Sequence, residues 1–130
     1  HIEREYFELK ATIDKNAFRE CVTLGNVNVG DKCTIVGNSA FIDCMAMNEI
    51  YLGSATITVE DFAIASTMME MPKEIHFYTA TAPNCYAHSF GNIGSPSFVL
   101  HNSSSVDDFL AGTDMADYYP KSTSVYTIAQ

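Results

Sequence analysis

The chain has few basic residues, no long apolar run and none of the short motifs that mark well-known catalytic sites. Only 7 of its 130 residues are Lys or Arg against 16 Asp or Glu, a formal net charge of −9. A surface that binds nucleic acid needs clustered positive charge, and so does one that docks on an anionic membrane. A membrane-spanning helix needs about 20 apolar residues. The composition therefore argues against nucleic-acid binding and against membrane insertion.

The residues that could carry catalysis or hold a metal lack the spacing that such chemistry uses. His76, His88 and His101 form no helical i, i+4 pair of the zinc-binding kind. The run Ser103–Ser105 has His101 and Asp107 nearby, but triads are built by geometry and no G-x-S-x-G elbow is present. We expect solvated or hydrogen-bonded surface histidines, no metal, no cofactor and no enzyme activity.

An internal repeat is the main feature of the sequence. A shift of 23 residues places Phe18 on Phe41 and Cys21 on Cys44. Two further, less regular copies follow, and the first of them is lengthened by an insertion of two residues within Met68–Pro72. Units this short bury their apolar face only by stacking, so we expect a solenoid of short parallel strands. Each copy carries an apolar pair with the period of two that is typical of strands: Val27/Val29, Ile50/Leu52, Ile75/Phe77 and Phe98/Leu100.

The repeat unit φ-x-x-x-A-F-x-x-C-x-x-L-x-x-φ-x-φ-G, where φ is aliphatic, resembles the BspA-type leucine-rich repeat over about residues 11–119. The chain departs from the family pattern at Ile64, which replaces an aromatic residue, at Thr67, which replaces the third Cys, and at Met115, where Trp is common. The resemblance implies a leucine-rich-repeat-like stack without catalytic residues. It also implies a bacterial protein that is secreted or displayed on the cell surface and serves adhesion or protein binding.

The sequence indicates a single domain over residues 1–130, with about four repeats over 11–101 and a C-terminal cap over 102–130. Ser105 and Asp108 form a capping box that begins a short helix. Further residues are expected to close the two ends of the stack: Phe109, Met115, Tyr118 and Tyr119 in the cap, Val125–Ile128 as a last strand, and Ile2–Leu9 as a strand or the remainder of an earlier repeat.

The four cysteines are expected to be core residues. Cys21 and Cys44 hold the same repeat position and should stack one coil apart, at about 4.8 Å, which is near the Cα separation that a disulfide accepts. Thr67 takes the next place without a thiol. We therefore expect buried, reduced thiols at all four positions, including Cys33 and Cys85. A Cys21–Cys44 disulfide stays open as the alternative.

The residues that alternate with the core positions should face outward on the strands. In leucine-rich repeats these strands line the concave side, which is the usual binding surface. Each strand contributes one residue to each of two columns, which are the candidate binding residues: Asn26, Glu49, Glu74 and Ser97 in one, and Asn28, Tyr51, His76 and Val99 in the other.

We therefore favour a non-catalytic extracellular binding or adhesion module that recognises a host or extracellular protein, or a glycan, through this face. Tyr51 and His76 should lie roughly 5 Å apart at the centre of the contact. Glu49 and Glu74 beside them predict a polar or basic ligand, with sensitivity to salt and pH. The alternatives are a structural spacer or anchoring domain of a larger surface protein and, third, an uncharacterised hydrolase.

Overall fold

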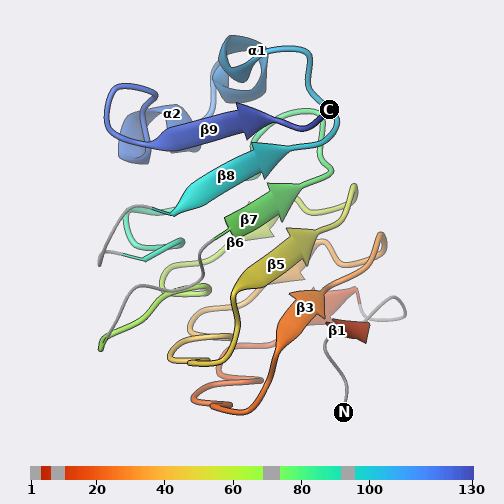
Figure 1. The fold of residues 1–130 in the computed structure, drawn as a ribbon, viewed down its shortest axis with the longest axis vertical. Coiled ribbons are helices and arrows are strands. Elements are labelled where there is room, and N and C mark those ends of the chain that lie inside the picture. Colours follow the sequence, from red (N-terminus) through yellow and green to blue (C-terminus); the bar gives the residue numbers. More distant parts are fainter. Residues whose placement is uncertain (1–3, 7–10, 69–73, 92–95) are drawn as a thin grey trace.

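The computed structural model describes residues 4–6, 11–68, 74–91 and 96–130. Over these ranges the chain winds into a stack of coils, with the N-terminal end at one pole and two short helices at the other (Figure 1). The elements in chain order are β1 (Arg4–Tyr6), β2 (Thr12–Ile13), β3 (Asn26–Asn28), β4 (Ile35–Val36), β5 (Glu49–Leu52), β6 (Thr58–Val59), β7 (Glu74–Phe77), β8 (Ser97–Leu100), α1 (Val106–Leu110), α2 (Asp114–Tyr118) and β9 (Val125–Ile128).

The larger sheet has six parallel strands in the order β1-β3-β5-β7-β8-β9. The pairing register aligns residues at the same repeat position, for example Ile50 with Ile75 and Ile75 with Phe98. Burial alternates along β5 and β8, so that every second side chain enters the core. This confirms the parallel solenoid that the repeat predicts, because parallel pairing of coils brings equivalent apolar residues into continuous rows.

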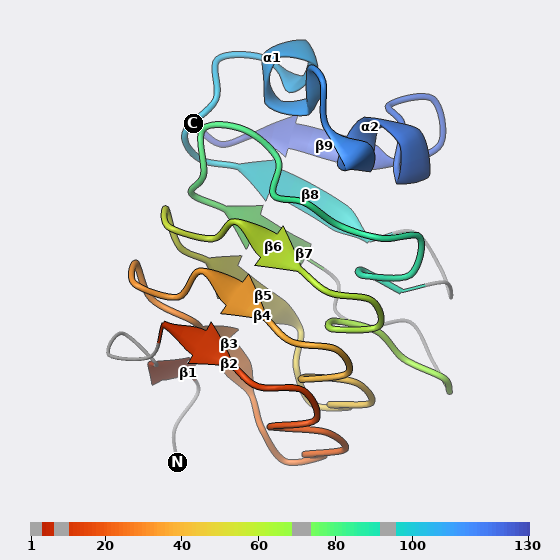
Figure 2. The same ribbon diagram turned by 180° about the vertical axis from the view of Figure 1, so that it is seen from behind.

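A second parallel sheet, β2-β4-β6, lies on the opposite side of the stack (Figure 2). Its strands have only two residues each, and they bury Ile13, Val36 and Val59. These aliphatic positions belong to the repeat unit, but the sequence pattern predicted no strands there. Two residues are too few to show a period of two, so the signal for this sheet was absent from the sequence pattern.

The turns that follow the second sheet repeat an unusual backbone conformation. Asn16, Ser39 and Phe62 have φ values of 60°, 57° and 58°, and Glu20 and Asp43 share this left-handed region at 56° and 58°. The conformation costs roughly 1–2 kcal/mol for a residue with a side chain. A ladder of backbone hydrogen bonds between successive coils holds it in place, including Phe18 N to Ala40 O, Phe41 N to Ala63 O and Ile64 N to Ser89 O.

The core fills as predicted in the middle coils and less completely in the first one. Phe41 is 1 % exposed and Ile64, its equivalent in the next coil, is fully buried. Phe18 is only half-buried and Cys21 is half-buried as well. The prediction of a buried thiol is therefore wrong for Cys21. Both residues are partly exposed because the first coil has a neighbour of its own kind on one side only.

All four cysteines are free thiols, and three of them are buried. The Cys44 thiol donates to the carbonyl oxygen of Phe18 at 3.1 Å. Burial raises the pKa of Cys44 to about 11 and that of Cys85 to about 12. Burial also raises the pKa of Cys33. These thiols act as small apolar residues in the core rather than as nucleophiles.

The C-terminal cap contains the predicted helix and a second one. The Ser105 hydroxyl accepts from the Asp108 amide at 3.1 Å, which confirms the N-terminal cap of α1. Thr113 caps α2 in the same way. Tyr119 is buried and its hydroxyl donates to the Ala87 carbonyl, whereas Tyr118 is 47 % exposed, against the prediction. Neither helix of the described ranges is long and apolar enough to cross a membrane.

Strands were also predicted at the two ends of the stack, and an insertion between residues 68 and 72. The predicted last strand Val125–Ile128 forms β9 and pairs in parallel with β8. Within the predicted Ile2–Leu9 segment, β1 pairs in parallel with β3, and the other residues lie outside those described. The predicted insertion at Met68–Pro72 also lies outside them, except for Met68.

Candidate functional site

The open face of the six-stranded sheet carries the two predicted columns. Glu49 pairs with Glu74 and Tyr51 with His76 across β5 and β7. The columns continue through Ser97 and Val99 on β8. Asn28 lies opposite Tyr51 on β3, with Asn26 one step before the aligned pair Val27 and Ile50. Outward alternation on each strand and parallel register between strands are sufficient to build this face.

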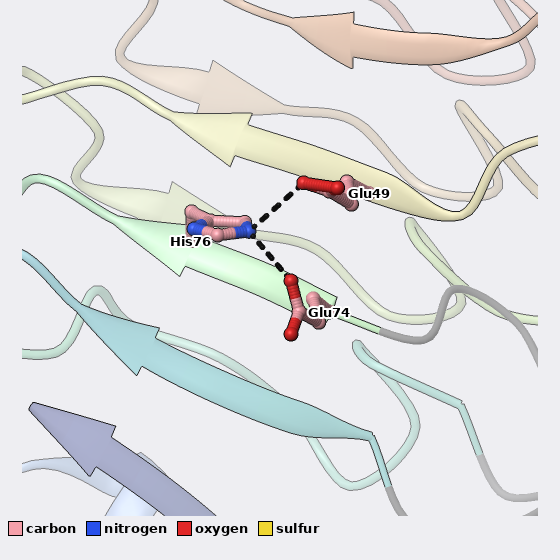
Figure 3. Close-up of side chains that lie close together, drawn as sticks. All are labelled: Glu49, Glu74 and His76. Atoms are coloured by element: carbon pink, nitrogen blue, oxygen red, sulfur yellow. Dashed lines mark hydrogen bonds and ion pairs between the residues drawn. The ribbon is translucent and has the colours of Figure 1, made fainter. Parts of the chain in front are cut away.

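His76 is the centre of the face, and both of its ring nitrogens have partners. Nε2 lies 3.2 Å from Glu74 Oε1 and 3.3 Å from Glu49 Oε2 (Figure 3). Nδ1 lies 2.8 Å from His101 Nε2. The predicted neighbour Tyr51 stacks on the imidazole with 4.3 Å between ring centroids. His76 is only 8 % exposed because neighbouring side chains on the same face cover the ring. Of the two expectations for this histidine, a hydrogen-bonded side chain is therefore confirmed and a solvated one is wrong.

Four rings form one group on this face, which we call the aromatic cluster: Tyr51, His76, His101 and Tyr78. His101 stacks on His76 at 5.0 Å and on Tyr78 at 4.3 Å between centroids. His101 and Tyr78 are not among the predicted binding residues. Both follow the strand alternation one step further, since each lies two positions after an outward residue. Extending the period of two beyond the predicted strand ends would have found them.

The electrostatics of the face centre on the two glutamates. Like charges directly opposite one another on neighbouring strands are destabilising. Glu49 and Glu74 are opposite, and His76 lies within ion-pair distance of both. The Tyr51 hydroxyl also donates to Glu49 Oε2 at 2.5 Å. Burial, and then the charge of neighbouring His76, lower the pKa of His101 below its ordinary value of 6.5.

A shallow depression adjoins the aromatic cluster at the ends of the strands. It has a volume of about 160 Å³ and is lined by Asn28, Gly30, Asp31, Gly53 and Tyr78. A Cβ atom on Gly53 would lie 2.0 Å from the Gly30 carbonyl oxygen, so glycine is required for the coils to approach here. Pockets for small molecules usually measure about 300–1,000 Å³. The depression is therefore a surface feature of the face rather than an enclosed ligand pocket.

The polar loop of the hydrolase hypothesis serves structural contacts. The Ser103 hydroxyl donates to the Ala80 carbonyl at 2.8 Å, and the Ser104 hydroxyl contacts Asp108 Oδ2 at 3.2 Å. Asp107 forms an ion pair with Lys121 at 2.7 Å. A second hollow of about 310 Å³ is lined by residues 54–57 and 79–84, none of which is Asp, Glu, His, Lys or Cys. These contacts do not favour a nucleophile and base in either place.

Of the other histidines, His88 lies apart from the open face. Its ring stacks on Phe62 at 4.9 Å and its Nδ1 is 3.9 Å from Asp61 Oδ2. Among the described residues, one group of His, Cys, Asp or Glu side chains is close enough to hold a metal ion, and it consists of Glu49, Glu74 and His76. Their ligand atoms all lie within 4.8 Å of one another.

Comparison with known proteins supports the repeat assignment. No curated protein and no solved structure matches the chain. A family model described as the BspA type leucine rich repeat region matches residues 11–105 in six copies. The match covers more than half of the chain and includes β3, β5, β7 and β8, which carry the two columns of the open face. The family often forms repeats of surface proteins. The chain belongs to the BspA-type leucine-rich repeat family.

Proposed function

We propose that this chain is a non-catalytic binding module of a secreted or cell-surface bacterial protein. It recognises a protein or a glycan through the open face of the six-stranded sheet. Membership of a repeat family that often occurs in surface proteins supports the location. The mostly polar columns on the strands support the choice of face, since a solenoid presents one continuous surface along its stack.

The aromatic cluster is the observation that carries the proposal. Tyr78 is 36 % exposed and Tyr51 is half-buried, so parts of both rings are available to a partner. Stacking on the two histidines holds the tyrosines in place. A tyrosine that is already ordered loses little conformational entropy on binding and offers a large contact area with a polar tip. The cluster therefore has the properties of an interface centre.

The charge of the face indicates the kind of partner. The whole chain has a formal net charge of −9, and Glu49 and Glu74 add acidic groups beside the cluster with side chains 31 % and 46 % exposed. This favours a polar or basic ligand. Exposed charges are screened by salt, so binding should weaken as the ionic strength rises.

The alternative is that the chain is a structural spacer or anchoring domain of a larger surface protein. The observation in its favour is that side chains of the face satisfy one another. His76 contacts both glutamates and His101, and the Tyr51 hydroxyl donates to Glu49. A face of this kind is stable without a ligand, which is the property that a spacer requires.

The test is a screen of this domain against purified extracellular proteins and a glycan array, followed by affinity measurements on variants. Tyr51→Ala with Tyr78→Ala removes the exposed rings of the cluster. The matched control replaces Tyr86 and Tyr118, which are 48 % and 47 % exposed and lie outside the open face.

We expect the first pair of substitutions to weaken binding at least about tenfold and the control pair to leave it unchanged, as for a few central residues that dominate an interface. Equal affinity for both variants would place the contact elsewhere on the molecule. A screen without any partner would favour the spacer.

A further inference from the structure

We propose that Glu49, Glu74 and His76 form a binding site for a divalent transition-metal ion, best suited to Zn²⁺, on the open face of the sheet. The site goes beyond the proposed recognition function and does not depend on it, and it replaces the expectation from sequence spacing that no metal is bound. Its three ligand atoms come from two adjacent strands, β5 and β7, and Figure 3 shows the two carboxylates and the imidazole converging.

Two of the three distances between ligand atoms fit a metal centre of zinc size. Zinc bonds of about 2.0–2.2 Å in tetrahedral geometry place neighbouring ligand atoms about 3.3–3.5 Å apart. In the structure His76 Nε2 is 3.3 Å from Glu49 Oε2 and 3.2 Å from Glu74 Oε1. The two carboxylate oxygens lie within 4.8 Å of each other, so rotation of the glutamate side chains must bring them to the same spacing around an ion.

The type of ligand selects the metal. One imidazole nitrogen and two carboxylate oxygens suit Zn²⁺ and its neighbours in the first transition row. Ca²⁺ takes six to eight oxygen ligands and Mg²⁺ an octahedral set of oxygens, usually with several waters. Three ligands including a nitrogen meet neither requirement. We therefore expect Zn²⁺ to bind in preference to Ca²⁺ and Mg²⁺.

Groups around the three ligands orient them for coordination. A ligating histidine usually donates its second ring N–H to a fixed acceptor, which directs the free lone pair at the metal. The His76 Nδ1 atom lies 2.8 Å from His101 Nε2, so Nδ1–H donation to His101 leaves the Nε2 lone pair facing the carboxylates. The Tyr51 hydroxyl donates to Glu49 Oε2 and holds that side chain. A carboxylate oxygen has a second lone pair for the ion.

Electrostatics and access also favour a cation here. The two glutamates are directly opposite on adjacent strands, and a divalent ion compensates both negative charges at once. The glutamate side chains are 31 % and 46 % exposed, so one side of the site is open to solvent. The fourth coordination position of a tetrahedral ion would therefore be filled by water or by a group from another molecule.

The experiment is a titration of the whole chain with Zn²⁺ by isothermal calorimetry, with Ca²⁺ and Mg²⁺ in parallel. A Cys21→Ser background removes the one half-buried thiol as a competing ligand. Glu49→Gln, Glu74→Gln and His76→Gln each remove one ligand, and His101→Phe removes only the acceptor for Nδ1. His88→Gln is the control, because His88 also lies beside a carboxylate but outside the cluster.

We expect one Zn²⁺ per chain and far weaker heats with Ca²⁺ or Mg²⁺. Each ligand variant should lose at least about 100-fold in affinity and His101→Phe about tenfold, within the range for outer partners of a ligand, while His88→Gln binds as before. Far-ultraviolet circular dichroism checks that each variant is folded, and the three separate ligand variants guard against one that is not.

Saturation only at millimolar Zn²⁺, equal affinity in folded ligand variants, or an equal loss in His88→Gln would overturn the site. Failure of the metal site is also distinguishable from failure of the proposed recognition function, because calorimetry with the metal alone involves no partner.

Discussion

The most direct measure of the stacked core is the cost of removing equivalent phenylalanines from two successive coils. Phe41 is 1 % exposed and sits between coils, whereas Phe18, at the same repeat position, is half-buried in the first coil. Their rings stack in parallel with 5.3 Å between centroids and an angle of 4°. Phe41→Ala should cost about 3–5 kcal/mol, the usual loss for a buried Phe.

Phe18→Ala should cost about half as much, roughly 1.5–2.5 kcal/mol, because part of its ring is already in contact with solvent. The assay is urea denaturation followed by circular dichroism. With a slope of about 2 kcal/mol per M, a loss of 4 kcal/mol lowers the midpoint by about 2 M. Val22→Ala serves as the control, since Val22 is 55 % exposed, and should change stability by no more than about 0.5 kcal/mol.

Two results would refute this reasoning. A loss under about 1 kcal/mol for Phe41→Ala would mean that the ring is not core. A loss for Phe18→Ala equal to that for Phe41→Ala would mean that the first coil is as well covered as the second. The slope should stay constant across the variants, because a changed slope would indicate that the stack no longer unfolds as one unit.

Further predictions concern the buried thiol of Cys85, the carboxylate of Asp43, the close approach of two coils at Gly53, and zinc binding. Burial raises the pKa of Cys85 to about 12 from an ordinary 9.0, so the thiol stays protonated in the folded state. The contribution of Cys85 to stability should therefore be constant below pH 9 and be lost towards pH 12, and a thiol reagent at pH 8 should label Cys85 only after unfolding. Burial raises the pKa of Asp43, but hydrogen bonds from Thr67 and Ser66 outweigh this effect and lower the pKa overall. The contribution of Asp43 to stability should therefore be present above pH 3.8 and be lost as the pH falls through the lowered pKa. Asp43→Asn should remove that part of the acid dependence in urea melts. Gly53→Ala should cost at least about 1–3 kcal/mol, the usual range for overpacking, because the added carbon meets a backbone oxygen; an unchanged melting temperature would show that the coils can separate there. Saturating Zn²⁺ should raise the melting temperature and a chelator should reverse the rise, and a rise that persists in His76→Gln would assign it to another site.

Much of the fold follows from the repeat in the sequence. The shift of 23 residues that superimposes Phe18 on Phe41 also superimposes Val27 on Ile50, so the parallel register of these two residues was predictable. The period of two then places Tyr51 and His76 on the same face as neighbours. These features depend on alternation along a strand and on the similarity of residues at equivalent repeat positions, and both can be read from one sequence.

Other features depend on the completed stack. The second sheet, the left-handed turns and α2 had no pattern strong enough to be read from the sequence. Residues at equivalent repeat positions also differ in solvent exposure, since Cys21 is half-buried and Cys44 is buried. A residue's place in the unit determines which way it points, but the number of coils above and below it determines how much solvent it meets.

The centre of the candidate site illustrates the same division. The sequence alone determined that Glu49, Glu74 and His76 point outward, because alternation on a strand is a local property. The folded stack brings their ligand atoms within 4.8 Å of one another and places His101 against the second nitrogen of His76. Side chains from different coils meet through packing and rotamer choice, which spacing along one chain does not encode.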